Sequence, residues 1–151
     1  MGDTDAKLCP AERARLTFDM RISATVKNAP GAHEASVRTD ASARSLSIPP
    51  KATGGGSAVN GGELLMLALA TCYCNDLYRE AARRNVRVDA VEVEASADFA
   101  GVGLAAANIT YKARVSSPET AEVVAQLLRD TDAVAEVHNT IRRGVPVLLV
   151  G

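Results

Sequence analysis

Residues 60–84 read NGGELLMLALATCYCNDLYREAARR, and the rest of the chain is organised around this stretch. Asn60 is a suitable N-cap, and Glu63, three positions later, can bond back to its backbone, which predicts a capping box at a helix start. Nearly every residue from Leu64 to Cys72 is apolar. Because a helix that is apolar on all sides must be buried, the stretch predicts a central core helix of roughly 37 Å.

The predicted helix carries two cysteines on different sides. At about 100° per residue, Cys72 shares a stripe with Asp76 and Arg79, where the helix surface changes from apolar to charged. Cys74 lies on the opposite side and fits a small buried core residue. Cysteines at i and i+2 of a helix point apart and cannot form a disulfide with each other. Cys72 is therefore the candidate for a sheltered, electrostatically tuned thiol, with a plain core position as the alternative.

The same stretch resembles the OsmC/Ohr family of osmotically induced and organic-hydroperoxide-resistance proteins. In that family an Asn-Pro-x-Glu-Leu-Leu pattern begins an alanine-rich helix, and a cysteine follows twelve residues after the asparagine. Asn60 and Cys72 have this spacing, Glu63-Leu64-Leu65 match the motif in register, and a glycine-rich PPKATGGGSAVN segment leads into it. The resemblance runs from about Ala24 to the C-terminus, so it covers most of the chain.

Composition excludes several classes of function. The chain has 151 residues, a net charge of −1 and a pI near 6.1, and it contains no tryptophan. These values predict neither nucleic-acid binding nor attraction to an anionic membrane surface. The N-terminus is charged from its third residue and has no apolar core, so we expect no signal peptide, and no run reaches the ~18 apolar residues of a spanning helix. We therefore expect a soluble cytoplasmic protein with reduced thiols.

Neither a metal site nor a cofactor is expected. The three cysteines lack the CxxC and zinc-ligand spacings. The glycine-rich loop at residues 53–57 lacks both the P-loop lysine and a GxGxxG pattern, which favours a tight connection into the helix over an anion site. Cys9 falls in a charged lead-in, residues 1–16, where an incidental free thiol is expected.

Alternation and helical periodicity predict the remaining elements. Three strands precede the central helix and two follow it: 16–27, 34–39, 43–48, 86–99 and 107–116. We expect a turn at residues 28–31. Ser117-Pro118 predicts the start of a helix over 119–129, and Asp130-Thr131-Asp132 predicts the start of another over 133–143. Residues 145–150 predict a final edge strand.

The expected order, β-β-β-α-β-β-α-α-β, is an α+β plan with an antiparallel sheet and a long buried central helix, in one domain over residues 17–151. One small sheet covers only one side of the helix, whereas residues 64–77 are apolar on both sides. A second copy of the chain is the economical cover, so we expect a homodimer with the central helices packed together. The resemblance implies the same intertwined homodimer.

The resemblance also implies a chemistry. In the family, the helix cysteine is the peroxidatic thiol, which attacks the O–O bond of an organic or lipid hydroperoxide and becomes a sulfenic acid. A second cysteine then forms a disulfide that an external dithiol reduces. Cys72 matches the first cysteine, but Ala135 stands at the resolving position. The early loop, residues 28–34, has no arginine, and Gly62 stands where the family has a glutamate. The resemblance implies a peroxiredoxin-like stress-response protein. Because the resolving cysteine is missing, we expect a cycle that uses one cysteine and an external thiol reductant.

Two residues are candidates to replace the missing partners. Arg79, two turns after Cys72, can favour its thiolate, whereas Asp76, one turn after it, would oppose the thiolate or occupy Arg79. The Asp76–Arg79 pair also fits an ordinary solvated ion pair. His138 lies in the late helix that faces the cysteine in the family, although a lone histidine is more often structural. The predicted catalytic set is Cys72, Arg79 and His138, with a lowered Cys72 pKa and a small hydroperoxide as substrate.

A non-catalytic reading remains open. In it, the chain is an OsmC-fold dimer that binds a small apolar ligand between its helices or senses redox state stoichiometrically. The two hypotheses differ in whether the protein turns over hydroperoxide through Cys72.

Overall fold

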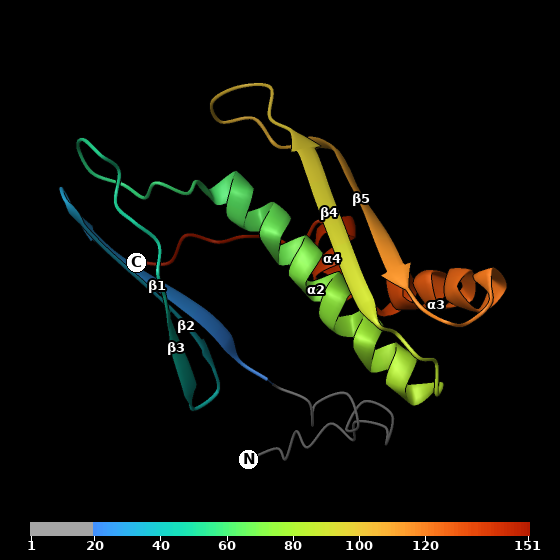
Figure 1. The fold of residues 1–151 in the computed structure, drawn as a ribbon. Helices are drawn as coiled ribbons and strands as arrows, with labels where there is room; N and C mark the ends of the chain where they lie inside the picture. The colour runs from blue at the N-terminus through green and yellow to red at the C-terminus, as the bar shows by residue number, and fades with distance from the viewer. Residues whose placement is uncertain (1–19) are drawn as a thin grey trace, which may run out of the picture. The chain divides into compact units, whose positions relative to one another are not determined.

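A computed structural model describes residues 20–151 (Figure 1). The chain divides into two compact units, one ending at Val59 and the other running from Asn60 to Gly151. Cys9, the predicted lead-in and the beginning of the first predicted strand lie outside the described residues.

The first unit is an antiparallel meander of three strands. They are β1 (Ile22–Ala29), β2 (Ala32–Thr39) and β3 (Ser42–Leu46), hydrogen-bonded in that order. Two-residue turns join them, and Gly31 and Asp40 adopt positive φ angles of 78° and 49° there, a conformation that glycine and aspartate accept more readily than most residues. The three predicted strands are confirmed, with shifted boundaries. The expected turn at 28–31 is shorter because β1 continues to Ala29.

One face of the meander is apolar. Val26 pairs with Ala35, and Ala35 pairs with Leu46, so the three side chains point to the same face. Ile22 has the same parity along β1, and Ile22, Val26 and Leu46 are all exposed. We call this surface, formed by Ile22, Val26, Ala35 and Leu46, the meander face.

The second unit begins with α2 (Gly61–Arg83), which starts at the predicted capping box. The Asn60 side chain accepts a hydrogen bond from the Glu63 backbone at 2.9 Å, and the Glu63 carboxylate accepts one from the Asn60 backbone at 2.8 Å. The predicted central helix is therefore confirmed. No helix among residues 20–151 combines the length and apolar character that crossing a membrane requires.

A hairpin and two helices pack against α2. β4 (Ala90–Asp98) and β5 (Ala107–Ser116) form a separate two-stranded antiparallel sheet, and β4 runs alongside α2 in Figure 1. The helices α3 (Ala121–Val134) and α4 (Glu136–Arg142) follow. The buried core consists of residues from α2, from α3 and from the link between α3 and α4: Tyr73, Leu77, Ala81, Leu127 and Ala135. The α+β class is confirmed, with two sheets instead of one.

The helix boundaries after β5 differ from the prediction. Thr120, not Ser117, caps α3, because its side chain accepts a hydrogen bond from the Val123 backbone. The Ser117 hydroxyl instead donates to the Arg87 carbonyl at 2.6 Å. The helix also runs through residues 130–132, where Thr131 is buried and its hydroxyl bonds to the Leu127 carbonyl one turn back. The break falls at Ala135, which has an extended backbone.

The predicted final strand is wrong for the single chain. Residues 145–150 have no strand assignment, and Val147, Leu148, Leu149 and Val150 are highly exposed. Pro146 has no backbone N–H to donate, and no described strand pairs with this segment.

We expect Leu77→Ala to lower the free energy of unfolding by about 2–5 kcal/mol, because Leu77 is completely buried and its removal leaves a cavity beside Tyr73 and Leu127. Urea unfolding followed by circular dichroism measures the change. Leu104→Ala, at an exposed loop residue, is the matched control and should change the free energy by less than about 0.5 kcal/mol. Equal effects of the two substitutions would contradict the position of the core.

Candidate functional site

Cys72 contacts two carboxyl groups from different helices. Its Sγ donates to Asp76 Oδ2 at 3.3 Å, one turn further along α2, and lies 4.0 Å from Glu136 Oε2 on α4. Cys72 is half-buried, whereas the Asp76 side chain is only 6% exposed. The thiol is therefore sheltered but not sealed.

Arg79 binds the carboxylates and not the sulfur. Its Nη1 lies 2.8 Å from Asp76 Oδ1 and 3.5 Å from Glu136 Oε1, and its Nε lies 3.4 Å from Glu80. The Asp76–Arg79 pair predicted from the sequence is present. It is not an ordinary solvated pair, because Asp76 is buried and its other oxygen accepts the thiol. We call Cys72, Asp76, Arg79 and Glu136 the thiol–carboxylate cluster.

The electrostatics around Cys72 oppose its ionisation. Burial raises the pKa of the thiol; a hydrogen bond to the Val137 backbone acts in the other direction, and Asp76 and Glu136 raise the pKa further. The expected lowering of the Cys72 pKa is therefore wrong. Arg79 does not lower the Cys72 pKa, because its guanidinium forms ion pairs with the carboxylates of Asp76 on its own helix and of Glu136 on α4.

Asp76 also has a shifted pKa, and each member of the cluster contributes to the shift. Burial raises the pKa of Asp76; the Cys72 thiol lowers it, the neighbouring Glu136 carboxyl raises it, and Arg79 lowers it. Within residues 20–151, Cys72, Asp76 and Glu136 are the one group whose ligand atoms lie close enough for a metal ion. Since Arg79 already supplies positive charge to both carboxylates, we assign no metal to them.

His138 packs against aromatic side chains and makes no hydrogen bond to Cys72. The ring is buried, and its centroid lies 4.5 Å from that of Tyr111 and 5.8 Å from that of Tyr73. Neither ring nitrogen has a hydrogen-bond partner among the described residues. Burial lowers the pKa of His138, with the nearby Arg142 acting in the same direction. The structure thus places His138 in an aromatic core environment and does not bring it into contact with Cys72.

The positions that depart from the family pattern have structural explanations. A Cβ at Gly62 would lie 3.1 Å from the Phe99 ring, so this ring occupies the space that a longer side chain would need. Ala135, at the resolving position, is completely buried in the link before α4. The next residue, Glu136, is the cluster member that the sequence prediction missed. Its position directly after Ala135, the residue at the resolving position, was the only signal in the sequence.

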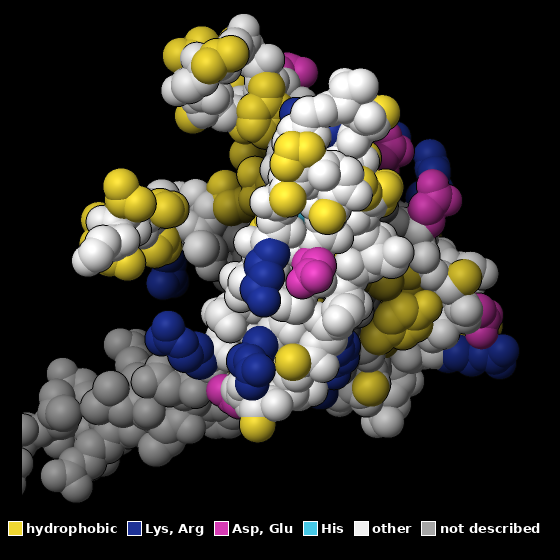
Figure 2. Space-filling model, turned by 90° about the vertical axis from the view of Figure 1, so that its left-hand side faces the viewer, with side chains coloured by type: hydrophobic (Ala, Val, Ile, Leu, Met, Phe, Trp, Pro, Cys, Tyr) yellow, Lys and Arg dark blue, Asp and Glu magenta, His cyan; other side chains and the backbone are white. Residues whose placement is uncertain are grey.

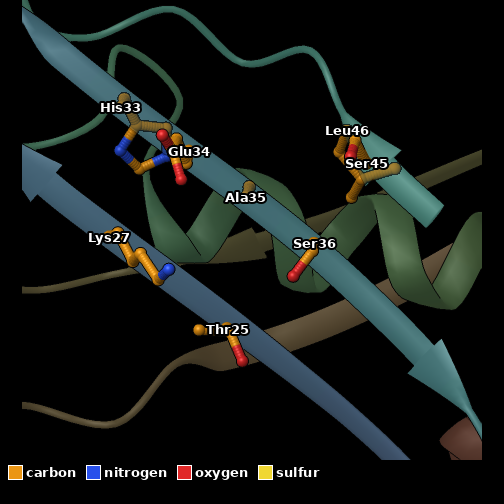
Figure 3. Close-up of a pocket in the computed structure, with 8 residues that line it drawn as sticks. All are labelled: Thr25, Lys27, His33, Glu34, Ala35, Ser36, Ser45 and Leu46. Atoms are coloured by element: carbon orange, nitrogen blue, oxygen red, sulfur yellow. The ribbon is translucent and has the colours of Figure 1, made fainter. Parts of the chain in front are cut away.

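Two of the hollows in the described residues differ in their lining. A pocket of about 290 Å³ on the meander has mixed polar lining, including Thr25, Lys27 and His33 (Figure 3). In the second unit, an open groove of about 660 Å³ lies at the start of α2, where Met66 and Phe99 supply its largest apolar side chains. Neither hollow is lined by Cys72.

The fold and its half-buried helix thiol define a class of α+β thiol proteins. Residues 54–150 match the family model described as OsmC-like protein, and the chain belongs to this family. The family resemblance inferred from residues 60–84 is therefore confirmed. No curated protein sequence gives a significant match.

Solved structures support the fold assignment. An OsmC-like protein from Mycoplasma pneumoniae has a TM-score of 0.57 and 17% identity, over 82% of this chain and 87% of that chain. An organic hydroperoxide resistance protein from Elizabethkingia anophelis has a TM-score of 0.53 and 19% identity, over 81% and 88%. A putative organic hydroperoxide resistance protein from Vibrio cholerae has a TM-score of 0.53 and 20% identity, over 83% and 86%. At these identities the likeness establishes the fold alone.

We expect acid to destabilise the protein through His138. Because its folded-state pKa lies below the ordinary value of 6.5, the unfolded chain binds the extra proton first. The contribution of neutral His138 to the free energy of unfolding is complete above about pH 6.5. It is lost as the pH falls from there to the folded-state pKa. His138→Phe keeps an aromatic ring beside the tyrosines but cannot take a proton, so its unfolding free energy should fall less between pH 7.5 and 5.

Urea unfolding at several pH values measures this difference. His33→Gln, at the only other histidine, tests whether the effect belongs to the buried ring. Parallel pH profiles for wild type and His138→Phe would contradict the assignment.

Proposed function

We propose that the protein reduces organic hydroperoxides, lipid hydroperoxides included, with Cys72 as the peroxidatic nucleophile. The observation that carries this proposal is the half-buried Cys72 thiol on the central helix of an OsmC-like fold, bonded to a carboxylate that Arg79 holds. The names of two structural neighbours, both organic hydroperoxide resistance proteins, support the same substrate class.

The proposed cycle uses one cysteine of the chain and an external thiol. Cys72 takes the terminal oxygen of the hydroperoxide and becomes a sulfenic acid while an alcohol leaves. One external thiol then forms a mixed disulfide with Cys72 and releases water, and a second restores the Cys72 thiol. The one-cysteine cycle is supported by Ala135, because the chain has no cysteine at the resolving position. Cys74, two residues along the helix, points away from Cys72. A reducing cytoplasm would supply the external thiol.

We further propose that the working form is a homodimer with paired α2 helices. One stripe of α2 is exposed in the single chain, at the i, i+3 and i+4 spacing of a packing face: Leu64, Leu67, Ala68, Thr71, Asn75 and Tyr78. The exposed apolar side chains visible in Figure 2, together with the meander face and residues 145–150, support burial against a second copy.

A second candidate function is a non-catalytic dimer that binds a small apolar ligand or records oxidation stoichiometrically. The raised Cys72 pKa favours this alternative, because it lowers the thiolate fraction at neutral pH. The open groove beside Met66 and Phe99 is the observation that favours ligand binding.

We expect Cys72→Ser to abolish turnover of cumene hydroperoxide with dithiothreitol as reductant. Wild-type protein should also form a dimedone adduct on Cys72 after one equivalent of hydroperoxide, detected by mass spectrometry. Cys74→Ser, two residues along the same helix, is the matched control and should retain turnover. If the wild-type protein is oxidised once at Cys72 without turnover, the result favours the second candidate function, in which the protein records oxidation stoichiometrically. If Cys72→Ser keeps full turnover, the proposed nucleophile is wrong.

We expect light scattering during gel filtration to give twice the 15.8 kDa mass of the chain. Leu67→Glu places a charge in the middle of the exposed α2 stripe, where Leu67 is 60% exposed, so it should shift the protein towards monomer by at least about tenfold in dissociation constant. Val102→Glu adds the same charge to an exposed loop residue and should leave the dimer intact. A monomeric wild type would contradict the pairing of the helices.

A further inference from the structure

We propose that Asp76 is the proton acceptor and donor of hydroperoxide reduction, and that Arg79 positions its carboxylate. This inference rests on the proposed function, and it concerns how a thiol that is protonated at rest can react. Asp76 would act as a catalytic residue because it contacts the reacting thiol, whereas Arg79 would act through Asp76 as a positioning residue.

The geometry provides the three parts that an activated nucleophile requires. Cys72 is the nucleophile, and its Sγ donates to Asp76 Oδ2 at 3.3 Å. The second carboxylate oxygen, Oδ1, is held by the Arg79 guanidinium at 2.8 Å. A nucleophile, a base in contact with it and a group that orients the base form the arrangement found in other activated nucleophiles. Here all three lie on one stripe of α2, at i, i+4 and i+7.

The surroundings of Asp76 suit it to accept a proton. Its side chain is only 6% exposed, so its oxygens are directed to the thiol and to Arg79 and not to bulk water. Burial raises the pKa of this carboxyl, which makes its ionised form a stronger base, although the thiol and Arg79 act in the opposite direction.

The other carboxylates near Cys72 are less suited to accept its proton. Glu136, which faces the thiol from α4, is farther from the sulfur at 4.0 Å, and its side chain is 68% exposed. Glu80, also on α2, contacts Arg79 and Arg83. Among the described residues, Asp76 is therefore the one carboxylate that is both buried and within hydrogen-bond distance of the thiol.

The proposed step is balanced without a further reactant. A sulfur electron pair attacks the terminal oxygen of ROOH, so an S–O bond forms while the O–O bond breaks. The sulfur is oxidised by two electrons and the peroxide bond is reduced. The thiol proton moves to Asp76 Oδ2, and the leaving RO oxygen takes that proton from Asp76 to become ROH. The products are Cys72 sulfenic acid, an alcohol and ionised Asp76, ready for the next turnover.

The decisive variant is Asp76→Asn, because the two possible roles of Asp76 predict opposite results. The substitution removes a negative charge beside the sulfur, so the Cys72 pKa should fall. If Asp76 were only an inhibitory charge, peroxide reduction at pH 7 would become faster. If Asp76 is the base, the rate of sulfenate formation should fall by about 10²-fold in spite of the larger thiolate fraction.

Glu136→Gln is the matched control. It also removes a negative charge near the sulfur but leaves the proposed base in place, so it should lower the Cys72 pKa without the loss of about 10²-fold in rate expected for Asp76→Asn. Arg79→Gln should slow sulfenate formation by an intermediate factor, since Asp76 keeps its contact with the thiol but loses its orientation. All variants are made on a Cys9→Ser, Cys74→Ser background, and their dimer mass and circular dichroism are compared with those of the parent.

Two measurements separate the outcomes. Absorbance of the thiolate near 240 nm across the pH range gives the Cys72 pKa, and stopped-flow oxidation by cumene hydroperoxide gives the rate constant. In the parent, a base mechanism keeps the rate nearly constant between the pKa values of Asp76 and Cys72. A rate that instead rises in proportion to the thiolate fraction would overturn the inference, even if Asp76→Asn failed to fold.

The failure of this inference differs from the failure of the proposed function. If the parent forms sulfenate and Asp76→Asn reacts as fast or faster, Asp76 is not the base but Cys72 is still the nucleophile. If the parent forms no sulfenate with any hydroperoxide, the proposed function fails and this inference fails with it.

Discussion

The burial of α2 is the constraint on which the rest of the structure depends. A helix with apolar residues around most of its circumference needs cover on every side, and the hairpin of β4 and β5 with α3 covers only part of it. The stripe of α2 around Leu67 is the part of this circumference that the second unit leaves exposed. A second copy of the chain would satisfy the requirement without any further domain.

The same helix also determines the chemistry at Cys72. The boundary between its apolar and charged parts places a thiol beside a buried acid, and α4 adds a second acid nearby. A half-buried site strengthens electrostatic effects, because water screens the charges less there. Burial and the two acidic neighbours raise the Cys72 pKa in spite of the hydrogen bond to the Val137 backbone, so the environment favours the protonated thiol. For the proposed hydroperoxide reduction, a base in contact with the sulfur therefore fits this environment better than a preformed thiolate.

The packing of His138 is a feature that the sequence did not predict. Its place in the late helix suggested a position facing the cysteine, but the ring packs against Tyr73 and Tyr111 instead. Tyr73 is the residue directly after Cys72, and it leaves α2 on a different side. Neighbouring positions of α2 thus have different surroundings: Cys72 contacts the carboxylates, whereas Tyr73 contacts the aromatic core that contains His138.

Local rules in the sequence determined the central helix with its capping box, the strand at residues 107–116, and the position of Cys72 beside Asp76 on one stripe of the helix. These features depend on residues a few positions apart, whose side-chain chemistry and periodicity are visible in the chain. The start of α3 at Thr120 and its continuation through residues 130–132 were missed, because Ser117 had a competing partner and Thr131 could be buried. Only the tertiary structure decided that Glu136 lies beside Cys72, that Arg79 binds carboxylates and not the thiol, and that the Cys72 pKa is raised. The Glu136 contacts join segments 64 residues apart in the chain, which spacing alone cannot specify. The raised pKa and the partners of Arg79 also depend on how deeply Cys72 and Asp76 are buried, which only the packed structure determines.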